Sequence, residues 1–282
     1  MSFLDRIVEC NRHDLSGFRP FIVAGARVGW LRHGFIERLR DLSDIFLADG
    51  DAVVLDPRLA DFEARSAALE PVLRALAAEG ALSGWRDEPY PVSTGFAAPA
   101  LLRMERAAVP AFGVRAHGVH LNGYVRRADG GFALWVARRA RDKPTYPGML
   151  DNMVAGGLPL GIGLRENLIK ECAEEAAIPR ALAERAIPVG AISYVQEAPA
   201  GLKPDTQFLF DLEVPADFEP RNTDGEIESF ALWPVEAVME TVAETTAFKP
   251  NCTLVIIDFL VRHGLIPPDH PDYLNIVRGL HQ

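Results

Sequence analysis

The feature that most constrains this chain is a glycine-rich loop that leads directly into a helical segment carrying three glutamates. Four glycines fall within residues 154–163, and glycine lets a backbone approach a ligand closely or adopt positive φ. In the segment that follows, Glu171, Glu174 and Glu175 are spaced so that a helix places them within a sector of roughly 100°. The opposite face, which includes Cys172, is predicted to be buried.

This cluster of carboxylates predicts a metal site. Three neighbouring carboxylates repel each other unless a cation neutralises them, and oxygen ligands suit Mg²⁺ or Mn²⁺ better than softer metals. The pattern therefore predicts a helix that holds hard divalent cations beside a phosphate group. The alternative is an ordinary solvated acidic face, in which Lys170 and Glu174 form an ion pair one turn apart.

The segment from Gly156 to Ile178 resembles the Nudix box. That box reads Gly, five residues, Glu, seven residues, and then Arg-Glu-U-X-Glu-Glu-X-Gly-U, where U is a bulky aliphatic residue. The resemblance makes Gly156 the leading glycine, whose carbonyl often joins the metal shell, and assigns Gly157 to substrate binding. It also implies that the metal ligands and one candidate catalytic base lie among three residues: Glu171, Glu174 and Glu175.

The chain departs from the box at several positions. Lys170 replaces the arginine, which keeps the charge but loses the planar fork. Cys172 occupies an aliphatic position, and Ala177 replaces the second glycine. Ile162 stands where the first glutamate belongs, with Glu166 as the nearest acid. This last change removes the usual salt-bridged support of the loop rather than the metal site.

The stretch AGGLPLGIGLRENLIKECAEEAAIP is similar to one Nudix branch in particular. That branch contains plant Nudix proteins and the Nudix half of fungal thiamine pyrophosphokinases, which carry an additional N-terminal domain. The similarity runs from residues 85–88 to residues 262–264. It implies hydrolysis of thiamine diphosphate, or of an oxidised form of it, to the monophosphate.

Composition limits the class of partner and compartment. The net charge of −10 and the pI near 5.2 argue against nucleic acid as the main partner. No apolar run approaches the ~20 residues that span a membrane, and the N-terminal residues lack the apolar core of a signal peptide. The three scattered cysteines fit reduced thiols. We therefore expect a cytoplasmic protein that binds a small-molecule diphosphate, and a homodimer is left open.

The chain is predicted to be an α/β protein with two units. Residues 1–110 are predicted to form a small N-terminal α/β domain, with an Asp-Gly hairpin at 45–55 and a helix at 61–78 that contains Pro71. Residues 111–282 are predicted to form a Nudix α/β/α sandwich that ends in a helix over 252–263. The N-terminal domain shows no catalytic cluster.

A cationic stretch lies just upstream of the glycine loop. Residues 138–143 hold four cations in an otherwise acidic chain, and such side chains bind phosphate. Arg139 and Lys143 have the spacing of the two cations that hold the diphosphate in isopentenyl diphosphate isomerases, which this stretch resembles. The alternative is a solvated basic turn.

A further carboxylate is expected beyond the box, in the loop that leads to the strand at 230–233. Many Nudix enzymes use an acid there as a metal ligand or base, and Glu226 is the first candidate, with Glu228 the second. Strand alternation would put both on one face, so spacing does not separate them. Four aromatic residues are candidates for a wall around a heterocycle, although packing in the core is the more common role for any one of them: Trp135, Tyr146, Tyr194 and Phe208.

These features support three functional hypotheses. The first is Mg²⁺- or Mn²⁺-dependent hydrolysis of a diphosphate. The second is isomerisation of an isoprenoid diphosphate, which in the resembling enzymes needs a cysteine that this chain does not obviously supply. The third is a binding module without catalysis, which the departures at Ile162 and Ala177 favour and the three glutamates oppose.

Overall fold

The computed structural model describes residues 2–143 and 145–282, and its larger part is built around a seven-stranded mixed sheet. The main path of the sheet runs β11-β12-β7-β8-β13, with β10 paired to β7 and β9 paired to β8. β7 and β12 are parallel, whereas the other pairs are antiparallel. The strands are β7 (His117–Arg126), β8 (Phe132–Arg139), β9 (Leu150–Asp151), β10 (Val154–Gly157), β11 (Ile187–Ala198), β12 (Gly201–Glu213) and β13 (Ile227–Pro234).

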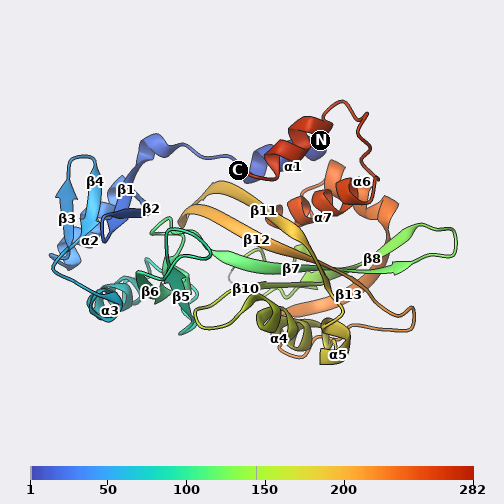
Figure 1. The fold of residues 1–282 in the computed structure, drawn as a ribbon, viewed down its shortest axis with the longest axis horizontal. Coiled ribbons are helices and arrows are strands. Elements are labelled where there is room, and N and C mark those ends of the chain that lie inside the picture. The colour runs from blue at the N-terminus through green and yellow to red at the C-terminus, as the bar shows by residue number, and fades with distance from the viewer. Residues whose placement is uncertain (1, 144) are drawn as a thin grey trace.

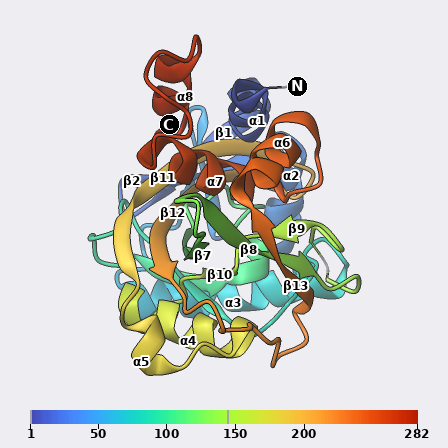
Figure 2. The same ribbon diagram turned by 90° about the vertical axis from the view of Figure 1, so that its right-hand side faces the viewer.

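Helices cover both faces of this sheet (Figures 1 and 2). α4 (Leu164–Ala176) and α5 (Arg180–Ala183) lie on one face, where Leu168 and Cys172 join an apolar core with residues of β7 and β12. α6 (Val235–Glu244) and α7 (Pro250–Arg262) bury their apolar sides in a second core on the other face. The predicted α/β/α sandwich is therefore confirmed, and so is the C-terminal helix.

A second, smaller unit is formed by the N-terminal part of the chain. Its four-stranded sheet has the order β2-β1-β4-β3, and a two-stranded sheet joins β5 to β6. Its elements are β1 (Phe18–Val23), β2 (Ala26–Arg32), α2 (His33–Leu42), β3 (Phe46–Asp49), β4 (Ala52–Leu55), α3 (Phe62–Ala78), β5 (Pro89–Val92) and β6 (Leu102–Glu105). The predicted Asp-Gly hairpin is β3-β4. α3 continues through Pro71 as one helix rather than two.

The first helix does not pack with the rest of this unit. α1 (Phe3–Cys10) contributes Ile7 and Cys10 to the core formed by α6, α7 and α8 (Tyr273–Gly279). Figure 1 shows α1 beside the C-terminal helices, with the chain then crossing to the N-terminal unit. The division of the chain at residue 110 stays a prediction. The core of the N-terminal unit extends from Phe21 to Val114.

α4 ends at a residue with left-handed backbone geometry. Ala177 has φ 52°, and the amide of Ile178 donates to the carbonyl of Cys172 at 2.9 Å. This is the position at which the box pattern has glycine, the residue that adopts positive φ without a steric penalty. The departure at Ala177 therefore leaves the fold intact and costs stability.

We expect Ala177→Gly to raise the free energy of unfolding by about 1 kcal/mol, because glycine relieves the left-handed strain. Ala173→Gly is the matched control, since Ala173 is exposed inside the same helix. That change should lower the free energy of unfolding by about 0.5–1 kcal/mol. Denaturant titration of both variants measures the difference, and destabilisation by Ala177→Gly would contradict the assignment.

Candidate active site

Two adjoining cavities open around the glycine loop β10. The first, of about 300 Å³, is lined by aromatic, amide and basic side chains together with small and apolar residues, and we call it the aromatic cavity. The second, of about 450 Å³, is lined mainly by carboxylates, and we call it the acidic cavity. Residues shared by both walls are Arg86, Arg106, Ala155, Gly156, Gly157 and Glu226. A ligand that spans this boundary would contact both chemical environments.

The helix α4 supplies the carboxylates of the acidic cavity. Glu171, Glu174 and Glu175 all line it, as the sequence predicted for one helix face. Glu175 is nevertheless buried, and it accepts a hydrogen bond from the backbone amide of Ala155 at 2.8 Å. A Cβ added at Gly156 would overlap the carboxylate of Glu171, so this glycine makes room for that side chain. The loop and the helix are therefore fitted to each other.

The electrostatics of these acids favour a bound cation. Burial raises the pKa of Glu175 well above its usual range, and burial likewise raises the pKa of Glu171. Lys170 Nζ lies 3.1 Å from Glu171 and 2.8 Å from Glu174, which partly neutralises that pair. A divalent cation would stabilise the ionised carboxylates further. The donor set consists of oxygens, which fits a hard metal ion.

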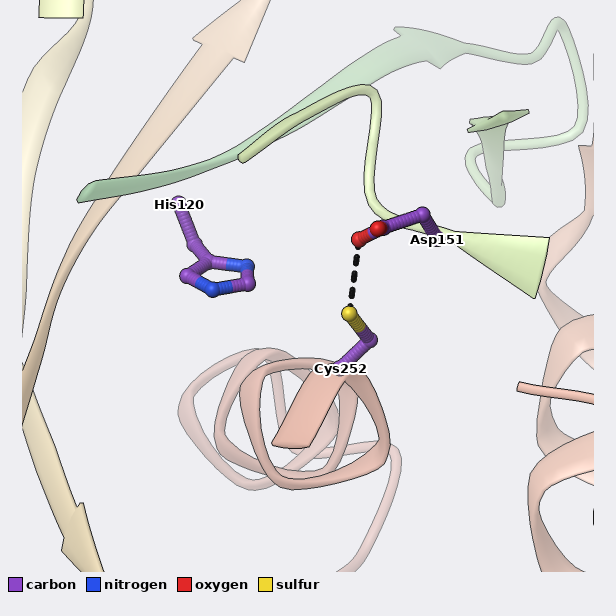
Figure 3. A group of neighbouring side chains, drawn as sticks. All are labelled: His120, Asp151 and Cys252. Carbon is purple, nitrogen blue, oxygen red and sulfur yellow. Dashed lines mark hydrogen bonds between the residues drawn. The ribbon is translucent and has the colours of Figure 1, made fainter. Parts of the chain in front are cut away.

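A second group of ligand-type side chains meets elsewhere. Among the described residues, His120, Asp151 and Cys252 form the one trio whose ligand atoms lie within 4.8 Å of one another. Figure 3 shows Cys252 donating to Asp151, at 2.7 Å. The oxygens of the three α4 glutamates are not gathered this closely, because Glu175 is turned toward Ala155 and Lys170 holds the other two.

The charges around this trio oppose metal binding. Arg139 lies 2.9 Å and Lys249 3.6 Å from Asp151. Although burial opposes ionisation, these cations lower the pKa of Asp151 to about 2, so its charge is already compensated. Burial raises the pKa of Cys252 well above its ordinary value and lowers the pKa of His120 to about 4. A neutral thiol beside two cations makes a structural hydrogen-bond network and a poor metal site.

The predicted cation pair, Arg139 and Lys143, reaches one cavity by two different sets of contacts. Arg139 is buried, and its guanidinium donates to Asp151 and to the backbone carbonyls of Thr145 and Tyr146. It reaches the wall of the aromatic cavity while fastening the loop that follows β8. Lys143 turns instead to Glu226, at 2.6 Å. Both side chains line the aromatic cavity, and each also has a carboxylate partner, so their joint binding of one diphosphate stays a prediction.

The geometry also separates Glu226 from Glu228. Glu226 lines both cavities and accepts from Lys143 at 2.6 Å and from Arg86 at 3.0 Å. Burial opposes its ionisation, but these two cations lower its pKa to about 2. Glu228 is exposed, pairs with Arg141 at 3.5 Å and lines neither cavity. The expected alternation fails because Glu226 precedes β13 and the strand has an irregular register between Ile227 and Ser229.

The wall residues missed by the sequence reasoning come mainly from the N-terminal unit. Arg86 and Arg106 line both cavities, and Tyr90 lines the aromatic one. A Cβ added at Gly157 would overlap the Tyr90 hydroxyl, and Leu160 donates to the carbonyl of Pro89 at 2.8 Å. Nothing local in the sequence marks these side chains, because their role depends on how the two units dock.

The aromatic cavity also contains an acid among aromatic side chains. Tyr146 and Tyr194 line it as predicted, whereas Trp135 and Phe208 pack against the core beneath α4. Tyr194 donates to Asp205 at 3.4 Å, and burial raises the pKa of Asp205 to about 6. An acceptor of this kind suits a heterocycle that carries amino groups or a positive charge.

An α/β/α sandwich with a carboxylate helix against a glycine loop is the architecture of the Nudix class, and comparison with known proteins agrees. Nudix hydrolase 24, chloroplastic, of Arabidopsis thaliana is 47% identical over 99% of this chain and 77% of its own length. Nudix hydrolase 20, chloroplastic, of the same plant is 46% identical with the same coverage. This chain belongs to the Nudix hydrolase family, which confirms the predicted plant-type branch and the enzyme class of pyrophosphohydrolases.

Two further comparisons describe parts of the chain. Residues 2–116 match a family described as a domain of unknown function, DUF4743. Among solved structures, the Nudix domain of Shewanella oneidensis NrtR complexed with ADP ribose is 12% identical, with a TM-score of 0.42, and the match covers 54% of this chain and 91% of that one. Across residues 2–143 and 145–282, no helix has the length and apolar character needed to cross a membrane.

We expect Arg139→Gln to lower the free energy of unfolding by about 3–5 kcal/mol, because it leaves Asp151 buried with one of its cations removed. Arg138→Gln is the matched control, since Arg138 is exposed and donates to the carbonyl of Gly148. Its effect should stay within about 1 kcal/mol. Equal stability of the two variants in denaturant titration would show that Arg139 does not anchor the loop.

Asp205 should make stability depend on pH. Burial raises its pKa from an ordinary value of 3.8 to about 6 in the folded protein, so folding favours its protonated form. The resulting stability is present at low pH and is lost as pH rises through about 6. Asp205→Asn should therefore raise the free energy of unfolding at pH 8 by about 3 kcal/mol and have little effect below pH 4. Exposed Asp217→Asn provides the control, and a pH-independent gain would refute the assignment.

Proposed function

We propose that this protein hydrolyses a diphosphate linkage in a small molecule with an aromatic organic group, using Mg²⁺ or Mn²⁺. The observation that carries the proposal is the junction of the acidic and aromatic cavities at Gly156 and Gly157. A diphosphate at this junction would have carboxylates that can hold a cation on one side. The organic group would extend toward Tyr146 and Asp205 on the other side.

The acids of α4 are the proposed metal ligands. Glu171, Glu174 and Glu175 would hold the ion, with the carbonyl of Gly156 beside them, and Gly157 would allow close approach of the substrate. When bound, the ion would neutralise phosphate oxygens and lower the pKa of a water molecule. The nearby chain supplies cations as well, since Arg86 and Lys143 converge on Glu226 at the junction.

The two candidate bases differ in their suitability. An efficient base has a pKa near the working pH, and the low pKa of Glu226, about 2, makes it a weak one. Glu226 is better suited to orient Lys143 and Arg86. Glu171, whose pKa burial raises, is the other candidate to accept a proton from water. Because Glu171 is also a proposed metal ligand, both Glu171 and Glu226 stay candidates for the base, and we propose no role in the chemistry for Glu228.

For the substrate we propose thiamine diphosphate or an oxidised form of it, which would be converted to the monophosphate. The molecule combines a diphosphate with a cationic thiazolium ring and an aminopyrimidine. Tyr146 and Tyr194 offer aromatic faces for such rings, and Asp205 offers an acceptor for an amino group or a positive charge. The similarity to plant Nudix proteins, noted for the loop sequence, supports the same substrate class.

The isomerase hypothesis receives less support. All three cysteines are free and buried, and Cys252 donates to Asp151. None of them lines either of the two cavities.

We also propose a cytoplasmic location and a homodimer. The free cysteines support the first of these proposals.

We expect turnover of at least one member of a diphosphate panel with Mg²⁺, and we expect Glu175→Gln to reduce kcat by about 100-fold or more. The panel contains thiamine diphosphate, its oxidised forms, ADP-ribose and isopentenyl diphosphate, with release of phosphate and monophosphate measured. Glutamine can still accept from the Ala155 amide, so the variant should fold. Loss of activity without loss of thermal stability would assign the carboxylate to catalysis.

The matched control is Glu166→Gln, because Glu166 lies on the same helix, is exposed and pairs with Arg180 at 2.8 Å. Its activity should equal that of the wild type. Absence of turnover across the panel, with the protein folded and Mg²⁺ bound, would favour the non-catalytic binding module. Double-bond migration without phosphate release would identify the isomerase.

A further inference from the structure

The N-terminal unit contributes a wall to both cavities. Arg86 and Arg106 come from the two ends of the β5-β6 region, and each borders the acidic and the aromatic cavity at once. Tyr90, on β5, closes against Gly157 of the glycine loop. The two proposed binding regions therefore meet beneath side chains that the sandwich itself does not supply.

A buried carboxylate sets the positions of both arginines. Glu105 accepts hydrogen bonds from the backbone amides of Arg86 at 2.9 Å and Glu88 at 3.0 Å. It also accepts from the amide of Ala107 at 3.4 Å, in the turn that begins with Arg106. A single acid thus ties the segment of Arg86 to the turn of Arg106. Such fixed backbone geometry lowers the entropy cost of presenting long side chains to a ligand.

Each arginine is also held at its tip by one carboxylate. Arg106 Nη1 donates to Glu88 at 2.8 Å, and Arg86 Nη1 donates to Glu226 at 3.0 Å. The Arg106 side chain still has 40% of its surface exposed, and that surface borders the cavities. Guanidinium groups carry five N–H donors in a fork that matches phosphate oxygens. One tether orients the fork and leaves donors for a ligand.

We infer that Arg86 and Arg106 form a diphosphate clamp, so that the N-terminal unit is part of the active site rather than an accessory to folding. The inference rests on the proposed function, since it assigns the phosphates of the same substrate to this boundary. Arg106 would bind phosphate oxygens, and Glu105 would act as a positioning residue. Tyr90 would close the wall behind the phosphates at Gly157.

The experiment uses the full chain with Arg106→Gln, Arg106→Lys and the control Arg103→Gln. Arg103 lies on the same strand, β6, but it is exposed, pairs with Glu63 at 3.1 Å and lines neither cavity. Calorimetry with imidodiphosphate and Mg²⁺ measures binding without hydrolysis. Steady-state kinetics with whichever panel diphosphate the wild type hydrolyses separates KM from kcat, and thermal unfolding is followed in parallel.

We expect Arg106→Gln to raise the Kd for imidodiphosphate and the KM about tenfold to a hundredfold, the usual loss for a charge-assisted hydrogen bond. Arg106→Lys should recover part of that loss, because it keeps the charge but not the fork. Arg103→Gln should match the wild type. All three variants should unfold at the temperature of the wild type.

A purely structural role for Arg106 predicts a different pattern. It would lower the unfolding temperature of Arg106→Gln and leave its imidodiphosphate affinity unchanged once the protein is folded, and that result would overturn the inference. Equal weakening by Arg103→Gln would overturn it as well. If the wild type binds imidodiphosphate through Arg106 but hydrolyses nothing in the panel, the proposed hydrolysis fails while the clamp stands.

Discussion

Gly156 and Gly157, which have no side chain, decide how the parts of this molecule pack together. The first lets the Glu171 carboxylate lie against β10, and the second admits the Tyr90 hydroxyl from the N-terminal unit. A Cβ at either position would overlap a neighbour that the site needs. Glycine is used here for close approach rather than for positive φ, because neither residue has a left-handed backbone. The helix, the loop and the N-terminal unit therefore converge on one short strand.

Around that strand, three acidic side chains have three different kinds of partner. Burial raises the pKa of Glu175 well above its usual range, and the backbone amide of Ala155 offsets only part of this effect. Asp151 is compensated by Arg139 and Lys249, which fixes its charge and fastens the loop after β8. Glu226 is shared by Lys143 of the sandwich and Arg86 of the N-terminal unit. A poorly compensated acid attracts a cation, whereas a fully compensated one supports structure.

Local patterns predicted most of the sandwich and the acidic face of α4. Helical spacing gathers Glu171, Glu174 and Glu175 wherever the helix docks, and an Asp-Gly turn specifies its own hairpin. The spacing did not predict that Glu175 is buried. Spacing shows which residues share one side of a helix, but it does not show what packs against that side.

Tertiary contacts explain what the sequence reasoning missed. Arg138 and Arg139 are adjacent on β8, and alternation sends one to solvent and the other into the interior. The four cations of residues 138–143 therefore do not all face the same cavity, and only Arg139 and Lys143 line the aromatic one. Tyr90 and Arg106 reach the cavities because the N-terminal unit packs against the sandwich. No periodic pattern in the sequence predicts such packing between units. At Ala177 the structure keeps what the sequence has lost. Its backbone is left-handed, as expected at the glycine position of the box, although the residue is alanine.

The acidity of the whole chain raises the question of how it could attract an anionic substrate. A net charge of −10 acts at long range, but ions screen it beyond about 8 Å at physiological salt. Inside the site, local charges decide the outcome, and Arg86, Arg106 and Lys143 stand where the cavities meet. The α4 carboxylates next to them would repel phosphate until a divalent cation reverses the local sign. Metal and diphosphate must then strengthen each other's binding by the same factor, since linkage is reciprocal. On the proposed function, this arrangement would favour ligands that arrive with a cation, and the acidic surface would repel polyanions that approach without one.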